Sequence, residues 1–183
     1  MRYVSPEDVA SFGGAEERQK AFAPEGWIGR QILEEFKAAA VVADTLFVHA
    51  GLLPEYAEGG LEALDLEVKR QLSDSNLRSK DGVLRSSGPL WVRAFATLDE
   101  EIACPLLRET LLHVGARRMV IGHTQVKTGE IRPKCGNRLL LADTVLSKAG
   151  YPKCWKPDQG RCRGSLSFVE ILGSRAFARR VTE

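Results

Sequence analysis

The chain has 183 residues, of which 44% are hydrophobic and 27% are charged, and its formal net charge is only +2 at pH 7. These values are typical of one globular domain with a buried core, and they exclude wholesale disorder. The basic residues are scattered, which argues against a nucleic-acid partner. No run approaches the roughly 20 apolar residues of a membrane span, and no leader opens the chain. We therefore expect one domain over residues 1–183, no membrane partner, and a cytoplasmic location.

Helices and two strands are predicted in the first fifty residues. Ser5 and Pro6, followed by two acidic residues, are typical of a helix start. "AEERQKAF" predicts a second helix that ends before Pro24, and "WIGRQILEEFKAAA" predicts a third with apolar residues at helical spacing. "AVVADTLFVHAG" then predicts two strands on either side of a turn at Ala43 and Asp44.

The sequence after the first fifty residues predicts two long helices and five further strands. Residues 59–74 have leucines and a valine at helical intervals, and residues 73–89 predict an exposed polar connector. Thr97 and Glu100 form a capping-box pattern before "EIACPLLRETLLHV", which Gly115 would close. An apolar run then ends at Gly122. "EIRPKC", "RLLLAD", "SLSFVEIL" and "AFARRV" predict four strands of a C-terminal sheet.

The four cysteines lie at positions 104, 135, 154 and 162, and none of them forms the CxxC pair of a persuasive zinc site. We predict reduced thiols, because intracellular chains seldom use disulfides. For Cys154 and Cys162, which flank a polar loop, a bridge or half of a metal site remains the alternative.

Two of the three histidines follow a predicted strand and lie beside a glycine or the start of an Ala-Gly pair: His49 in "TLFVHAG" and His123 in "RMVIGHT". A histidine in such a loop can project a ring nitrogen into a cleft, and neutral imidazole is the commonest transition-metal ligand. Glycine there would let the backbone approach an ion or a phosphate closely. A lone histidine at a strand end is more often bonded to backbone. The repeated arrangement favours a shared metal site at one end of a sheet.

Both segments closely resemble the late motifs of the calcineurin-like metallophosphoesterases, within the phosphoprotein phosphatase superfamily, which read approximately HGG or HAG and GH. "LFVHAGLLPEY", "VIGHTQ", "RYVSPEDVASFGG", "GPLWVR" and "LLLADTVLSKAG" are most similar to its Shewanella-like, bacterial-type branch, over residues 2 to about 150. The resemblance implies an α/β fold, an αββα sandwich of mixed sheets flanked by helices. It also implies hydrolysis of phosphate monoesters at a two-metal site of manganese, iron or zinc, with His49 and His123 as ligands of the second metal.

The family's earlier motifs, approximately GDxHG, GDxxDRG and GNHE, do not occur in the sequence. The resemblance therefore implies that residues 1–183 are the C-terminal portion of the domain, with the N-terminal half of the site missing. We expect no catalytic residue within the chain, because the bridging aspartate and the general-acid histidine would lie upstream of Met1. Two dications about 3.5 to 4 Å apart need anionic bridging ligands, which two imidazoles do not provide. We expect weak or single-metal binding, and an isolated chain without catalysis.

Four other side chains have expected roles. Arg93 in "GPLWVR" lies where related enzymes hold the phosphate with arginine, whose planar fork suits this contact, and a structural arginine is the alternative. Asp143 would add a carboxylate or lie beside the site as a structural residue. Trp91 is predicted to be core, and His113 to have a structural role near a helix end.

Three hypotheses follow from these observations. The chain is part of a metal-dependent phosphatase that acts on a phosphorylated protein or a small phosphate ester. Alternatively, it is an inactive relative that binds phosphorylated partners or regulates another phosphatase. In the third hypothesis it is an unrelated scaffold whose two histidine loops arose by accident.

Overall fold

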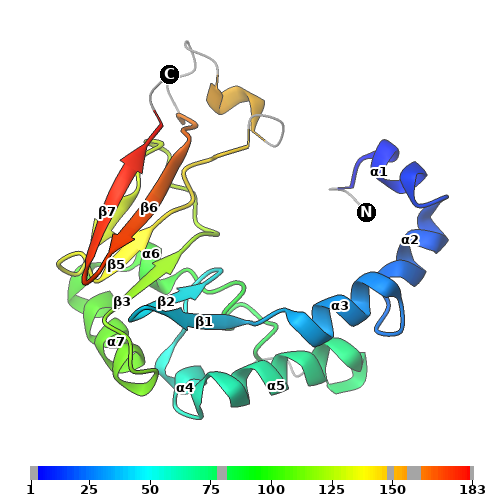
Figure 1. The fold of residues 1–183 in the computed structure, drawn as a ribbon, viewed down its shortest axis with the longest axis horizontal. Helices are drawn as coiled ribbons and strands as arrows, with labels where there is room; N and C mark the ends of the chain where they lie inside the picture. The colour runs from blue at the N-terminus through cyan, green and yellow to red at the C-terminus, as the bar shows by residue number, and fades with distance from the viewer. Residues whose placement is uncertain (1–3, 78–81, 148–150, 156–161, 182–183) are drawn as a thin grey trace. The chain divides into compact units, whose positions relative to one another are not determined.

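The computed structural model describes residues 4–77, 82–147, 151–155 and 162–181 (Figure 1). The chain groups into two compact units, the first formed by residues 1–37 and 69–78 and the second by residues 38–68 and 79–183. A single domain over residues 1–183 stays a prediction. None of the helices in the described part of the chain is long and apolar enough to cross a membrane.

The first unit is helical, as predicted. It contains α1 (Pro6–Ser11), α2 (Ala15–Phe22), α3 (Trp27–Glu35) and the short 3-10 helix η1 (Ser75–Leu77). The Ser5 hydroxyl accepts a hydrogen bond from the Asp8 backbone N–H at 3.0 Å, which confirms the predicted cap. Arg18 of α2 joins this helix to α1, because its Nε lies 2.8 Å from the Asp8 carboxylate. Its guanidinium also lies 4.5 Å from the ring centre of Phe22 in the same helix.

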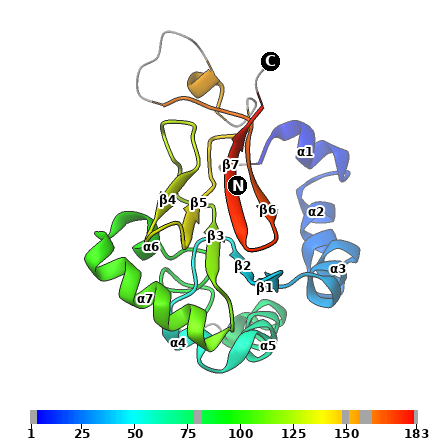
Figure 2. The same ribbon diagram turned by 60° about the vertical axis from the view of Figure 1, so that its left-hand side comes forward.

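The second unit is built on a mixed five-stranded sheet in the order β1-β2-β3-β5-β4 (Figure 2). Its strands are β1 (Ala39–Val42), β2 (Thr45–Val48), β3 (Arg118–Ile121), β4 (Arg132–Lys134) and β5 (Leu139–Leu141). The three central strands run parallel, and the two edge strands are antiparallel to their neighbours. Loops that follow β2, β3 and β5 therefore begin at the same edge of the sheet.

Helices flank this sheet, which confirms the predicted α/β class. They are α4 (Pro54–Ala57), α5 (Gly60–Ser73), α6 (Ala94–Thr97) and α7 (Glu100–His113), although residues 69–73 of α5 are grouped with the first unit. The buried face of α7 includes Leu107 and Leu111, and α7 contacts β3. Gly115, at φ +65°, follows α7 as predicted. The capping box is wrong, because Glu100 instead accepts a hydrogen bond from the Cys135 backbone N–H at 2.8 Å.

A separate hairpin packs against the main sheet. It consists of β6 (Ser167–Leu172) and β7 (Arg175–Arg180), and its Val169 and Ala176 pack against a core cluster that includes Val120 and Leu140. The predicted four-stranded C-terminal sheet is wrong, because β4 and β5 pair with the main sheet. Every residue of β3 is buried as a result, whereas Phe47 on β2 remains 36% exposed.

Two disulfides overturn the prediction of reduced thiols. Cys104 in α7 is bonded to Cys135 in the turn after β4, and Cys154 is bonded to Cys162. The second bridge is the alternative that the sequence left open, and residues 156–161 within its loop lie outside the described residues. Of the predicted polar connector, residues 78–81 also lie outside them, and its remaining part forms η1 and a series of turns.

Candidate functional site

His49 and His123 lie side by side at the carboxyl edge of the sheet. Val48 pairs with Ile121 in the parallel register of β2 and β3, and the Gly122 backbone N–H donates to the His49 carbonyl at 2.8 Å. The Nε2 atom of His49 is 3.2 Å from the Nδ1 atom of His123. The prediction that both imidazoles occupy one end of the sheet is confirmed.

The backbone at His123 is unusual for a residue with a side chain. Its φ is +61°, in the left-handed region that residues with a Cβ rarely adopt. A tight turn accompanies it, in which the Thr124 N–H donates to the Gly122 carbonyl at 2.6 Å. Strained backbone of this kind concentrates at functional sites, where surrounding structure holds it in place.

The loop that carries His49 is fixed by buried contacts. The Ala50 N–H donates to the Pro89 carbonyl at 2.9 Å, and the Thr110 hydroxyl of α7 donates to the Leu52 carbonyl at 2.8 Å. Gly51 has φ +150°, and a Cβ on it would lie 2.5 Å from the Phe95 ring. Glycine is needed here for packing against Phe95, and the expected close approach of the backbone to an ion or a phosphate stays a prediction.

Arg93 joins the histidine pair from the segment before α6. Its Nη1 donates to the Thr124 hydroxyl at 3.0 Å and approaches the His123 carbonyl at 3.4 Å. These bonds hold the His123 turn, which is a structural role. A guanidinium has five N–H donors, so the same exposed side chain retains donors for a phosphate.

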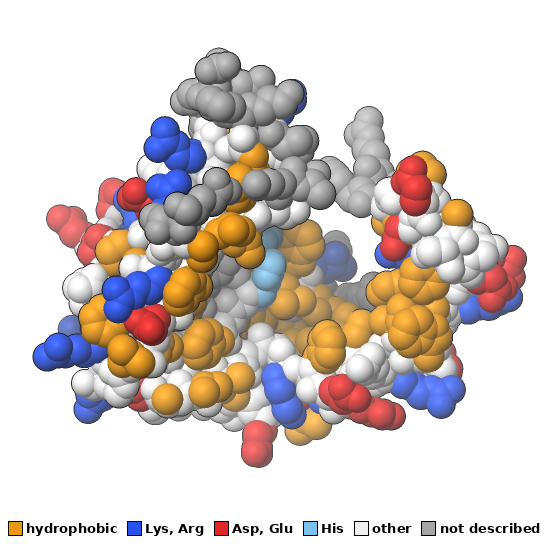
Figure 3. All heavy atoms as spheres, turned by 45° about the horizontal axis from the view of Figure 1, so that its top comes forward, with side chains coloured by type: hydrophobic (Ala, Val, Ile, Leu, Met, Phe, Trp, Pro, Cys, Tyr) orange, Lys and Arg blue, Asp and Glu red, His pale blue; other side chains and the backbone are white. Residues whose placement is uncertain are grey.

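Trp91 also belongs to this site, and its prediction as a core residue is wrong. The side chain is 56% exposed, and the ring stands edge-on to His123 with 5.4 Å between centroids. Trp91 and Arg93 line an open hollow of about 590 Å³ together with residues 84–86. Figure 3 shows histidine side chains exposed on the face that it draws, beside hydrophobic ones. The only sequence signal for Trp91 is its position two residues before Arg93.

The surroundings of His123 favour the neutral ring. Burial lowers the pKa of His123 below its ordinary 6.5, and the positive charge of Arg93 and the neighbouring His49 lower it further. The Asp143 carboxylate and the Trp91 backbone act in the opposite direction without reversing the effect. Its Nε2 is buried without a hydrogen-bond partner among the described residues. A neutral imidazole is the form that binds a metal.

The donor set fits one ion better than two. Two imidazole nitrogens bound to one ion at roughly 2.0 to 2.1 Å lie about 3 Å apart, which agrees with the separation of this pair. Among the described residues, no third histidine, cysteine or carboxylate brings a ligand atom within 4.8 Å of both nitrogens. The Asp143 carboxylate instead accepts from the Val145 N–H at 3.3 Å, and Asp44 lies at the other end of β2.

The general acid that the resemblance implies upstream of Met1 stays a prediction. Within the described part of the chain, the two expected ligands His49 and His123 lie beside each other, and their role as metal ligands stays a prediction. The structure therefore brings together the metal and phosphate candidates without testing where the proton donor lies.

Comparisons with known proteins point to one class. No family model matches the chain. It is 33% identical over 144 residues to Shewanella-like protein phosphatase 2 of Arabidopsis thaliana, a match that covers 75% of this chain and 36% of that protein. Shewanella-like protein phosphatase 1 of Plasmodium berghei is 24% identical over 188 residues, covering 93% of this chain and 51% of the relative.

The solved structures with a similar fold are also protein phosphatases. The cold-active protein-tyrosine phosphatase of a Shewanella species matches with a TM-score of 0.60 and 18% identity, over 91% of this chain and 47% of that one. A point mutant of a cold-active protein tyrosine phosphatase matches with a TM-score of 0.62 and 20% identity, over 78% of this chain and 44% of that one. The fold is therefore that of part of a protein phosphatase. The resemblance to the Shewanella-like branch is confirmed, and the chain spans about half the length of these proteins or less.

Proposed function

We propose that the chain contributes part of a metal-dependent phosphatase site, in which His49 and His123 hold one divalent ion and Arg93 binds the substrate phosphate. The observation that carries this proposal is the 3.2 Å separation of the two ring nitrogens. The relatives named protein phosphatases support the reaction class. Manganese, iron and zinc all accept imidazole nitrogen, so each is a candidate metal.

Each side chain has a separate task in this proposal. Arg93, already oriented by Thr124, presents its remaining N–H donors to the phosphate oxygens. The low pKa of His123 keeps its ring available as a ligand at neutral pH. Trp91 lines the approach to the site with an exposed apolar ring. A bound divalent ion would supply Lewis-acid polarisation of a phosphoryl oxygen and offset negative charge.

The two-metal form of the proposal requires ligands from outside the chain. Among the described residues, the histidine pair supplies two ligand nitrogens, and no carboxylate lies close enough to bridge two ions. We infer that a second ion, a bridging carboxylate and a proton donor come from a preceding half of the fold, upstream of Met1. The second candidate function, an inactive module that binds phosphorylated partners, is favoured by the same lack of a carboxylate.

Hydrolysis of an aryl phosphate with excess Mn²⁺ distinguishes the two functions. The 183-residue chain alone should act scarcely above background, because general acid catalysis, which commonly contributes about a hundredfold to ten-thousandfold, is missing. Fusion behind the corresponding upstream half of the Arabidopsis relative should restore turnover, which His49→Ala or His123→Ala should then remove. Phosphotyrosine and phosphoserine peptides would be compared, since the solved relatives are named tyrosine phosphatases.

Any of three results would overturn parts of this proposal. Strong metal-dependent hydrolysis by the chain alone would show that it needs no preceding half. Turnover that is unchanged by both histidine substitutions in the fused protein would contradict the ligand assignment. A folded fusion that binds phosphopeptide without turning it over would favour the binding module.

A further inference from the structure

Four arginines surround a hollow at the amino edge of the sheet, the edge opposite the histidine pair. The hollow has a volume of about 560 Å³ and includes Arg117, Arg118, Arg138 and Arg175 in its lining. Arg118 begins β3, whereas His123 follows the end of the same strand. Strands rise by about 3.3 Å per residue, so the two positions lie roughly 15 Å apart. The hollow is separate from the candidate metal site.

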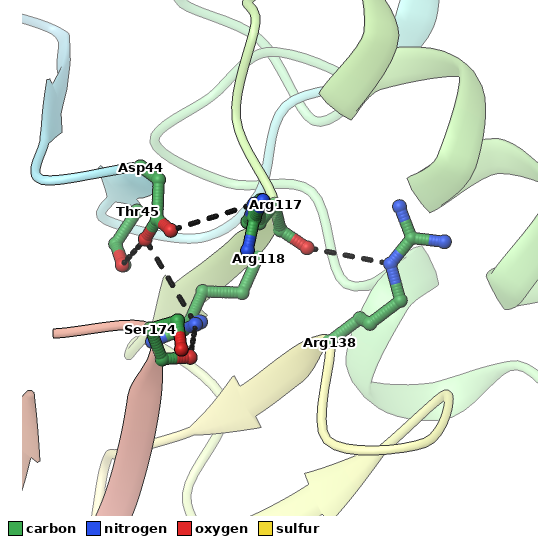
Figure 4. Close-up of polar contacts among 6 residues, drawn as sticks. All are labelled: Asp44, Thr45, Arg117, Arg118, Arg138 and Ser174. Atoms are coloured by element: carbon green, nitrogen blue, oxygen red, sulfur yellow. Dashed lines mark hydrogen bonds and ion pairs between the residues drawn. The ribbon is translucent and has the colours of Figure 1, made fainter.

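The topology of the sheet brings these arginines together from three distant segments. Arg138 precedes β5, which pairs with β3, and the Met119 N–H donates to the Arg138 carbonyl at 2.8 Å. The Arg138 side chain lies against the same strand, because its Nε donates to the Arg117 carbonyl at 3.3 Å (Figure 4). Arg175 begins β7, and packing of the neighbouring Ala176 fixes the hairpin there.

The positive charge of this hollow is only partly balanced. Asp44 lies 3.7 Å from the Arg117 Nε and 3.9 Å from the Arg118 Nη2, through its two carboxylate oxygens. No acidic residue lines the hollow in the described part of the chain. One carboxylate does not neutralise four guanidinium groups. The uncompensated charge favours an anionic ligand.

Arg118 provides the second, independent observation. Its side chain is 8% exposed, and Figure 4 shows it directed toward Ser174, whose carbonyl accepts a hydrogen bond from Nη2. Its Nη1 is buried without a hydrogen-bond partner among the described residues. A buried, unpaired donor on a charged group is costly, and native structures rarely leave one without a reason. Arg118 also lines the hollow, so an anion bound there would interact with the charge of this guanidinium.

We infer that this hollow is a second anion site, which binds a phosphate group that is either free or carried on a peptide. A phosphate offers several oxygens and up to two negative charges, which suits guanidinium forks that converge from different strands. The inference does not depend on the proposed function, because none of its residues belongs to the histidine site.

Isothermal titration calorimetry of the metal-free 183-residue chain at low salt tests the site. Inorganic phosphate and a phosphoserine peptide would be used as separate probes, since the tighter one identifies the source of the phosphate group. Arg138→Ala and Arg175→Ala should each weaken binding by about tenfold, the usual effect of losing one charge-assisted hydrogen bond. Arg180→Ala is the matched control, because Arg180 is exposed on the same hairpin but does not line the hollow.

Three results would overturn the inference. These are no binding of either probe, equal weakening by the Arg180→Ala control, or loss of binding on Arg93→Ala alone, which would place the anion at the histidine site. A measurement without substitution gives an independent check. Amide NMR shifts of Asn137 and Ser174 in the unmodified chain should move on titration with phosphate, while those of Glu7 in α1 and Glu16 in α2, which belong to neither site, should stay in place.

Discussion

The Nε2 atom of His49 lies 3.2 Å from the Nδ1 atom of His123, although 74 positions separate the two residues in the sequence. The parallel pairing of β2 with β3 causes this proximity, because both histidines follow strands that end at the same edge. The separation suits a hydrogen bond in the metal-free pair and also suits two ligands of one ion.

The first prediction concerns protonation of His123 in the metal-free protein. NMR titration should give a pKa below 6.5, because burial opposes the charged ring and Arg93 adds repulsion. Arg93→Gln should raise the pKa of His123, since this substitution removes a positive charge. A His123 pKa at or above 6.5, or a further decrease in Arg93→Gln, would contradict the described environment.

The same shift makes stability depend on pH with a defined sign. The folded chain holds its His123 proton less tightly than the unfolded chain, so acid favours unfolding. The stability contributed by the neutral His123 ring is lost as the pH falls from about 6.5 toward the pKa of the folded state. Below that pKa, this contribution no longer changes with pH. Measured by urea unfolding, the free energy of unfolding should fall more steeply with decreasing pH in this window for the wild type than for His123→Asn.

The second prediction concerns Gly51 in the His49 loop. Gly51→Ala combines positive φ with a Cβ that would lie 2.5 Å from the Phe95 ring. It should therefore lower the free energy of unfolding by about 3 kcal/mol or more. Gly115→Ala is the matched control, because Gly115 has φ +65° but no atom of the described residues lies within 4 Å of the added Cβ. Its cost should be about 1 to 2 kcal/mol by urea unfolding. Equal costs would contradict the packing argument.

Local patterns predict most of the secondary structure and the two metal-ligand candidates. The strand-then-histidine pattern at His49 and His123 lies within a short stretch in each case, and the hairpin turn at Ala43 and Asp44 has the predicted place, with both residues at positive φ. These features depend on side-chain periodicity and turn chemistry, which are local properties.

Features that depend on distant segments do not follow from local patterns. A large aromatic residue such as Trp91 favours the core, but the turn before α6 leaves it exposed beside His123. The bridge between Cys104 and Cys135 spans 31 positions and arises only when β4 and α7 meet. The arginine hollow likewise needs the hairpin turn at Arg175 to reach the start of β3.

The third prediction concerns Lys134, a buried cation that holds α6 in place. Its Nζ donates to the Phe95 carbonyl at 3.1 Å and to the Leu98 carbonyl at 2.7 Å. Lys134→Met would leave these acceptors without their donor and should destabilise the chain by about 1 to 3 kcal/mol. The exposed Lys127→Met should change the free energy of unfolding by less than about 0.5 kcal/mol. Similar effects of the two substitutions would count against the described contacts.

The fourth prediction compares the two disulfides. The Cys104–Cys135 bridge closes a separation of 31 residues, and the Cys154–Cys162 bridge closes one of 8. Loop-closure entropy then gives the longer bridge about 3 to 4 kcal/mol of stabilisation and the shorter one about 2.5 kcal/mol. Replacing Cys104 and Cys135 by serine should therefore lower the midpoint of urea unfolding more than replacing Cys154 and Cys162. The opposite order would show that the length of the loop closed by each disulfide does not govern its contribution to stability.

Calorimetric titration of the 183-residue chain with Mn²⁺ tests the central claim, that His49 and His123 share one divalent ion. We predict a single weak site, weakened at least about tenfold by His49→Ala or by His123→Ala, since each removes one of two protein ligands. His113→Ala is the control, because His113 is exposed in the last turn of α7. Mn²⁺ binding that is as strong in both site variants as in the control, or no Mn²⁺ binding by the wild type, would contradict the claim.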